Sequence, residues 1–109
     1  MIDSLNTSTL VATATQRRMV NFFKALSDDT RQKILKLLDG GEQTVTQIVS
    51  NFNLSQPTIS RHLAVLSQAE LVTGQRRGQN VYYSLNEGVL NDTMNEFLGR
   101  FDAPDAKAD

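Results

Sequence analysis

The stretch that decides the fold covers residues 55–63 and reads Ser55-Gln56-Pro57-Thr58-Ile59-Ser60-Arg61-His62-Leu63. Ile59, Leu63 and Leu66 recur at the spacing of one helix face, so a helix starting at Ser55 would bury these three side chains. Ser55 is placed to cap this helix, and Pro57 lies in its first turn, where a missing amide proton breaks no hydrogen bond. The first turns of the helix would then expose a set of hydrogen-bonding side chains, namely Gln56, Thr58, Ser60 and Arg61.

Short segments on both sides of this helix extend the pattern. Before it, residues 44–51 predict a short helix capped by its first residue, and residues 52–54 predict a turn. After it, residues 71–73 and 80–85 are β-prone, and the loop 74–79 between them holds two glycines and two arginines. Helix, turn, helix and basic hairpin in this order favour a winged helix-turn-helix fold.

Further helical patterns flank this segment. The apolar spacing predicts helices over about residues 9–26, 28–38 and 87–101. The oxygen-bearing residues from Ser27 onward are a start signal for the second of these helices, and Gly40-Gly41 ends it. On the outer surface of that second helix we expect the basic side chains Arg31, Lys33 and Lys36.

The 109 residues suit one domain with a modest core. The predicted fold is mainly α, with about five helices and a two-stranded wing. We expect a flexible arm over residues 1–8, the folded domain over residues 9–101 and a disordered acidic tail over residues 102–109. No apolar run is long enough to cross a membrane, and residues 1–6 lack the features of a secretory signal, so a cytoplasmic location is expected.

The charge distribution is uneven although the net charge is only −1. Residues 43–86 carry three arginines and one glutamate, whereas residues 87–109 carry two basic and six acidic side chains. The segment with the predicted helix-turn-helix and wing is therefore the basic part of the chain. This is a weak electrostatic footprint for binding a polyanion, and two copies in a dimer would double it.

Polar and basic side chains of the predicted helix and wing are the candidate DNA contacts. Amide, hydroxyl and guanidinium groups hydrogen-bond base edges and phosphates, and a basic hairpin tip suits phosphate or minor-groove contact. The alternative is an ordinary amphipathic helix with a solvated polar face and solvated tip charges. The candidates are Ser55, Gln56, Thr58, Ser60, Arg61, His62, Arg76, Arg77 and Gln79.

His62 is the only histidine, so it cannot form a metal site without other ligands. It either touches DNA or hydrogen-bonds within the domain. Asp92 and Glu96 share one face of the last predicted helix and are solvated acids more often than ligands of a hard cation. With no cysteine, no glycine-rich phosphate loop and no histidine paired with a nucleophile, we predict no catalytic residue, no metal site and no cofactor.

The first and last predicted helices are the candidate dimer contacts. Apolar residues of the last helix form a single ridge, and the adjacent Phe22 and Phe23 indicate that the first helix packs on two sides. The alternative is that the ridge caps the core of a monomer. The candidate interface residues are Leu10, Met19, Phe22, Leu90, Met94, Phe97 and Phe101.

Three segments strongly resemble the ArsR/SmtB family of bacterial repressors. They are residues 23–35 (FKALSDDTRQKIL), residues 54–66 (LSQPTISRHLAVL), and Leu71-Val72 followed by Arg76-Arg77-Gly78-Gln79 and Tyr82-Tyr83. The resemblance covers about residues 17–100. It implies a homodimeric winged-helix protein that binds an inverted repeat in operator DNA and represses transcription, with the first and last helices at the dimer interface.

The departures from the family pattern concern metal sensing. The family's best-known members use a cysteine motif on the third helix, where this chain has Thr44-Val45-Thr46-Gln47-Ile48, and a second family site needs histidines that the last helix lacks. We therefore expect a sequence-specific regulator that is not a thiolate-type metal sensor, with operator DNA and itself as partners and a small molecule or protein as a possible effector. The alternatives are a partner-binding, antitoxin-like co-regulator and a non-specific architectural DNA binder.

Overall fold

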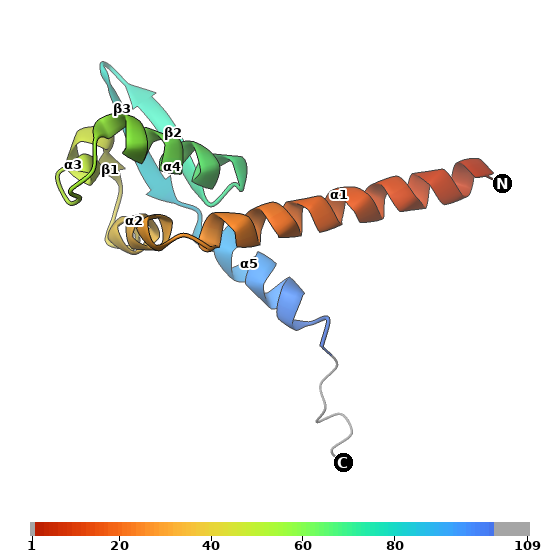
Figure 1. Ribbon diagram of the computed structural model, residues 1–109. Helices are drawn as coiled ribbons and strands as arrows, with labels where there is room; N and C mark the ends of the chain where they lie inside the picture. The colour runs from red at the N-terminus through yellow and green to blue at the C-terminus, as the bar shows by residue number, and fades with distance from the viewer. Residues whose placement is uncertain (1, 102–109) are drawn as a thin grey trace, which may run out of the picture.

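The computed structural model describes the backbone of residues 2–101 (Figure 1). Side chains are described from residue 13 onward. Five helices and a small sheet follow one another along the chain. In order, the elements are α1 (Ile2–Leu26), α2 (Asp29–Asp39), β1 (Gln43–Thr44), α3 (Val45–Val49), α4 (Gln56–Gln68), β2 (Val72–Arg77), β3 (Asn80–Leu85) and α5 (Glu87–Leu98). The predicted winged helix-turn-helix is confirmed, with α3 and α4 as the helix pair and β2–β3 as the wing.

Side-chain caps fix where the central helices begin. Asp28 accepts a hydrogen bond from the backbone N–H of Arg31 at the start of α2. Thr44 and Gln47 form a reciprocal capping box at the start of α3, and Ser55 accepts from the N–H of Thr58 at the start of α4. These contacts are local, which is why the sequence predicted all three helix starts correctly.

One core holds the helices and the wing together. Ile59, Leu63 and Leu66 of α4 are buried as predicted. They pack with buried residues of α1, α2, α3 and the base of the wing, namely Phe22, Ala25, Ile34, Leu35, Leu38, Ile48, Leu71 and Val72. Because α4 is covered on this side by the rest of the domain, its opposite side faces outward.

The sheet has three antiparallel strands in the order β1-β3-β2, one more than predicted. The additional strand, β1, is only two residues long and pairs Gln43 with Tyr83. The predicted loop 74–79 is also wrong, because the strands run to Arg77 and resume at Asn80, its partner in register. Gly78, with φ of 64°, supplies the left-handed residue that such a tight turn requires.

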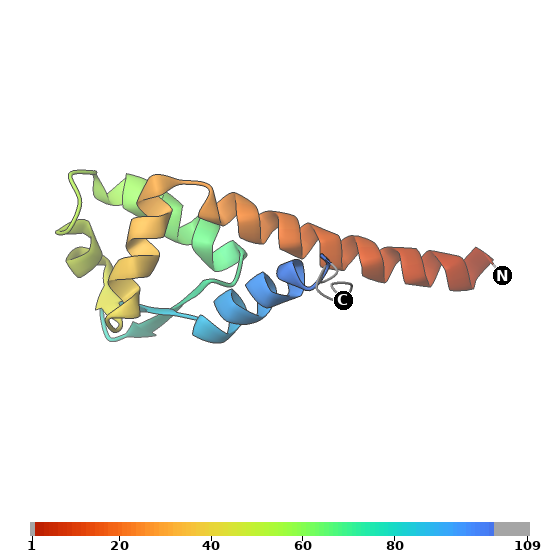
Figure 2. The ribbon, with the colours of Figure 1, turned by 90° about the horizontal axis from the view of Figure 1, so that it is seen from below.

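Helix α1 is longer than predicted and extends well beyond the body of the domain, with α5 beside its C-terminal half (Figure 2). It begins at Ile2, not near Thr9, so the expected arm over residues 1–8 is helical from residue 2. No glycine or proline interrupts this stretch of sequence, so nothing local stops the helix. Helix α5 ends at Leu98, three residues before the expected position, and the predicted tail lies outside the described residues.

Candidate nucleic-acid interface

Helix α4 has one apolar face and one polar face, and burial separates them sharply. Ile59 and Leu66 are 0% exposed and Leu63 is 1% exposed. On the other side, Gln56, Ser60 and Arg61 are exposed, as predicted. No side-chain hydrogen bond within the described part of the chain involves these last three residues. Their donors and acceptors are therefore available to a ligand.

Ser55 and Thr58, two further candidate contacts, have structural roles at the start of α4. The Ser55 hydroxyl accepts from the Thr58 backbone N–H at 3.3 Å and donates to the Thr58 hydroxyl at 3.0 Å. Thr58 is also half-buried. Both hydroxyls are thus engaged by the cap, which leaves Gln56, Ser60 and Arg61 as the uncommitted polar side chains of this face.

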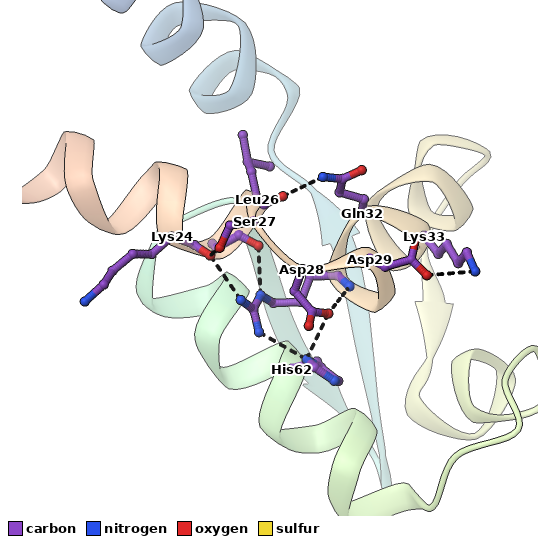
Figure 3. Close-up of polar contacts among 10 residues, drawn as sticks. Lys24, Leu26, Ser27, Asp28, Asp29, Gln32, Lys33 and His62 are labelled. Atoms are coloured by element: carbon purple, nitrogen blue, oxygen red, sulfur yellow. Dashed lines mark hydrogen bonds and ion pairs between the residues drawn. The ribbon is translucent and has the colours of Figure 1, made fainter.

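His62 turns inward, toward the junction of α1 and α2 (Figure 3). Its Nδ1 lies 3.2 Å from Nη1 of Arg31 and 3.7 Å from Oδ2 of Asp28. The side chain is only 19% exposed. Of the two alternatives for His62, the structure shows the contact within the domain, because the helical spacing of 100° per residue places His62 between the buried and exposed faces.

The Asp28 carboxylate beside His62 is held in its charged form. Its pKa is lowered chiefly by the hydrogen bond from the backbone N–H of Arg31, and in addition by the charge of the Arg31 guanidinium, against a partial desolvation that raises it. A carboxylate that caps a helix is stabilised by the free amides and by the positive end of the helix dipole. Asp28 therefore adds a fixed negative charge at the start of α2.

On the wing, the two arginines occupy different environments. The Arg77 guanidinium donates from Nη1 to Oε2 of Glu42 at 2.6 Å and from Nη2 to Oε1 at 3.0 Å. Nη2 also donates to the Gln75 amide oxygen, and the guanidinium lies 4.7 Å from the centre of the Tyr82 ring. We call this group the wing brace.

Within the wing brace, the positive Arg77 and the negative Glu42 form an ion pair. The hydrogen bond from Arg77 lowers the pKa of Glu42, and the same bond raises the pKa of Arg77. The bond joins the wing to Glu42, just before β1. The sequence did not predict this contact, because a two-residue strand such as β1 has no sequence signal. Arg76 and Gln79 are exposed, and within the described residues no hydrogen bond or ion pair occupies the Arg76 side chain. Arg77 was predicted as a DNA contact together with Arg76, but only Arg76 is uncommitted.

The predicted dimer residues divide between the core and the surface. Met19 and Phe22 are 4% and 1% exposed within a single protomer, so their assignment to a dimer surface is wrong. Leu90 and Met94 are half-buried against the same core. The two-sided α1 explains the error, because adjacent residues such as Phe22 and Phe23 point to different surfaces. The side chain of Leu10 lies outside those described.

An aromatic row near the end of α5 forms the exposed apolar surface. The rings of Phe23 and Phe97 lie 4.7 Å apart and those of Phe97 and Phe101 lie 5.2 Å apart, all edge to face. Phe101 is 63% exposed. Val20 of α1 and Leu98 of α5, which were not predicted to lie at an interface, are also exposed, at 42% and 56%. We call Val20, Phe23, Phe97, Leu98 and Phe101 the terminal apolar surface.

The described part of the chain contains no group of three or more potential metal ligands. Asp92 and Glu96 line a cleft between α1 and α5 together with Arg18 and Glu70. Among the described residues, no helix combines the length and the apolar character that a membrane crossing requires.

A helix pair, an outward polar face on its second helix and a β-hairpin wing together define a winged helix-turn-helix DNA-binding protein. The model of the arsR family of bacterial regulatory proteins matches residues 28–73. A transcriptional repressor of Bacillus subtilis, SdpR, is 54% identical over 80 residues, which are 73% of this chain and 89% of the repressor. The chain belongs to the arsR family.

Other relatives agree with this assignment. An arsenical resistance operon repressor from Staphylococcus aureus is 38% identical over 78 residues, covering 72% of this chain and 75% of its own. Among solved structures, a homodimeric winged helix-turn-helix DNA-binding domain from Mycobacterium bovis superposes with a TM-score of 0.69. It is 28% identical, and the match covers 81% of this chain and 82% of that domain.

Proposed function

We propose that this protein is a transcriptional repressor that binds an inverted-repeat operator as a homodimer. The observation that carries this proposal is the face of α4 formed by Gln56, Ser60 and Arg61, which is exposed and uncommitted while the opposite face is fully buried. A helix of this kind, preceded by a short helix and followed by a wing, inserts into the major groove. The relatives that are named repressors support the sign of regulation.

On this proposal, each protomer places α4 in a major groove and Arg76 at the neighbouring backbone. Ser55, Thr58 and Gln79 stay secondary candidates, because Ser55 and Thr58 form the cap of α4 and Gln79 lies in the wing turn. His62 and Arg77 are paired within the domain with Arg31 and Glu42, so we propose that they hold this surface in place and do not contact DNA. The contact of Arg76 supplies sequence-independent affinity, whereas Gln56 and Arg61 supply base discrimination.

The homodimer is proposed from the terminal apolar surface, Val20, Phe23, Phe97, Leu98 and Phe101. Exposed aromatic and leucine side chains gathered on two adjacent helices are costly in water and favourable between two copies. The homodimeric state of the M. bovis domain supports the same arrangement. An effector, whether a small molecule or a protein, would act by favouring a dimer geometry that mismatches the spacing of the half-sites.

Binding to DNA from immediately upstream of the protein's own coding sequence tests the proposal, with equal-length random duplexes as the reference. Fluorescence anisotropy at physiological salt should show tight, selective binding with two protomers per duplex. Arg61→Ala should reduce the selectivity, whereas Lys36→Ala, which removes an exposed basic side chain of α2, should leave it unchanged. A random-sequence selection with the wild-type protein identifies a preferred duplex if the upstream region is not the target.

The outcomes separate the competing functions. Equal affinity for every duplex, with a steep dependence on salt, contradicts the repressor and supports an architectural DNA binder. If the selection recovers no duplex that binds, the repressor and the architectural DNA binder are both contradicted, and the partner-binding co-regulator is supported.

A further inference from the structure

One arginine, Arg31, contacts both the end of α1 and the middle of α4 from its position on α2. Its side chain leaves α2, and its Nε donates to the backbone carbonyl of Ala25 at 2.8 Å. Nη2 donates to the carbonyl of Lys24 at 3.0 Å, and Nη1 lies 3.2 Å from Nδ1 of His62 in α4 (Figure 3). The same guanidinium therefore contacts the end of α1 and the middle of α4. We call Arg31, His62 and the two carbonyls the α1–α4 joint.

The chemistry of the α1–α4 joint suits a guanidinium. The last carbonyls of α1 lie at the negative end of the helix dipole, so a cation that donates to them is favourable. Ser27 also donates to the Lys24 carbonyl from its N–H and its hydroxyl, so Arg31 shares that acceptor with Ser27. Because arginine only donates, its contact with His62 is a hydrogen bond in the tautomer whose Nδ1 accepts. Lysine has one ammonium group and cannot span two carbonyls and an imidazole in a fixed geometry.

His62 lies on α4 next to Arg61, so the α1–α4 joint bears on the orientation of the exposed face of α4. His62 follows Arg61 directly, comes immediately before the buried Leu63 and lies at the edge of the buried face of α4. Apolar contacts of α4 with the core are not directional, whereas a hydrogen bond from a guanidinium to a ring nitrogen specifies distance and angle. The rotation of α4, and with it the direction of the exposed Arg61, is therefore tied to the end of α1.

We propose that Arg31 and His62 are positioning residues that couple the end of α1 to the orientation of α4, so that a change at the dimer surface alters DNA binding. Val20 and Phe23, which belong to the terminal apolar surface, lie within one to two turns of the carbonyls that Arg31 holds. The part of this proposal that concerns DNA rests on the proposed repressor function. The mechanical coupling of α1 to α4 does not.

Four single variants and one double variant test the coupling on the tightest duplex that the wild-type protein selects from a random library. Arg31→Lys keeps the positive charge but loses the planar guanidinium that donates in several directions, and we expect about tenfold weaker DNA binding. His62→Leu removes the acceptor and should cost about the same. His62→Asn, whose amide oxygen can replace Nδ1 as acceptor, should stay within about twofold of wild type. Arg31→Gln combined with His62→Leu should bind no more weakly than Arg31→Gln alone.

Two results in the DNA-binding series would overturn the proposal. Additive losses in the double variant would show that the two residues act independently. A shallower salt dependence in His62→Leu, with no effect of Arg31→Lys, would mean that His62 contacts a phosphate directly.

A measurement without DNA separates failure of this proposal from failure of the repressor function. Hydrogen exchange of the free protein should show faster exchange in Arg31→Lys both at the end of α1 and along α4, with His62→Asn close to wild type. If the wild-type protein selects no duplex but this pattern holds, the coupling stands and the repressor function fails. If only the end of α1 changes, the coupling is wrong.

Discussion

Helix α4 and the wing lie side by side on the proposed DNA-binding surface but are held in place by different forces. Three side chains of α4 are almost completely buried, so apolar packing holds that helix against the core. In the wing, Tyr83 and Leu85 of β3 pack against the core, but in β2 only Val72 is buried, and the outer part of β2 is held by its backbone ladder and by the bidentate contact of Arg77 with Glu42. Burial is insensitive to salt, whereas an exposed ion pair is screened by it. The attachment of α4 to the core should therefore be insensitive to salt, whereas the contact that holds the outer part of the wing should weaken as salt is added.

The largest effect should come from removing a buried contact of α4. Leu63→Ala deletes a side chain that is 1% exposed, and we expect a loss of about 2–5 kcal/mol in the free energy of unfolding. Urea denaturation followed by circular dichroism measures it. Ser60→Ala, one turn away on the exposed face, is the matched control and should change stability by less than about 0.5 kcal/mol. Equal losses in both variants would contradict the division of α4 into two faces.

The next effect concerns recognition by the exposed face of α4. Arg61→Ala should weaken binding to the selected duplex by about 1–3 kcal/mol and relax preference at one base position, without affecting the free energy of unfolding. Competition binding against single-base variants of the duplex measures both. A uniform loss across all sequences would instead assign Arg61 to a phosphate.

A smaller effect on stability should come from the cap of α2. Asp28→Ala removes the acceptor for the Arg31 N–H and should cost about 1 kcal/mol in the free energy of unfolding, measured by urea denaturation at about pH 7. Because the folded pKa of Asp28 lies below its unfolded value, this stability is present above about pH 4 and is lost as the pH falls through the folded pKa.

Asp28→Asn is the control for the charge, because asparagine also caps helices but does not titrate. The difference in stability between wild type and Asp28→Asn should shrink from about pH 7 to about pH 3. A difference that stays constant over this range would contradict the role of the carboxylate charge.

The smallest effects should distinguish the two wing arginines. Arg76→Ala should reduce the salt slope of DNA binding by about 0.9 per protomer, as expected for one lost phosphate contact. Arg77→Ala should leave the slope nearly unchanged, since its guanidinium is paired with Glu42. Binding titrations over a range of salt concentrations measure both slopes.

Glu42→Gln tests the pairing of Arg77 separately from its charge, because it removes the carboxylate that pairs with Arg77 and keeps the Arg77 guanidinium. If the wing brace positions the wing, Glu42→Gln should weaken DNA binding at low salt. At high salt, where the ion pair of the wild type is already screened, Glu42→Gln should bind DNA as the wild type does. Tighter binding with a steeper salt slope would instead show that Glu42 merely masks a phosphate contact of Arg77.

Most of the fold followed from local sequence signals. The caps at Asp28, Thr44 and Ser55 and the buried face of α4 depend on residues within a few positions of one another, so spacing alone predicted them. The start of α1 was missed because its polar first turns carry no apolar stripe. The strand β1 was missed because two residues are too few for a period.

The candidate site was predicted only as a set of polar side chains, without their partners. Sequence by itself determined that α4 has a polar and an apolar face, because the helical repeat is a property of the local backbone. Tertiary structure alone decided that Arg31 holds His62, that Glu42 holds Arg77, and that Phe22 belongs to the protomer core. The physical reason is distance along the chain. Both polar pairs join residues more than thirty positions apart, and a charge is committed or available only according to what the fold brings beside it.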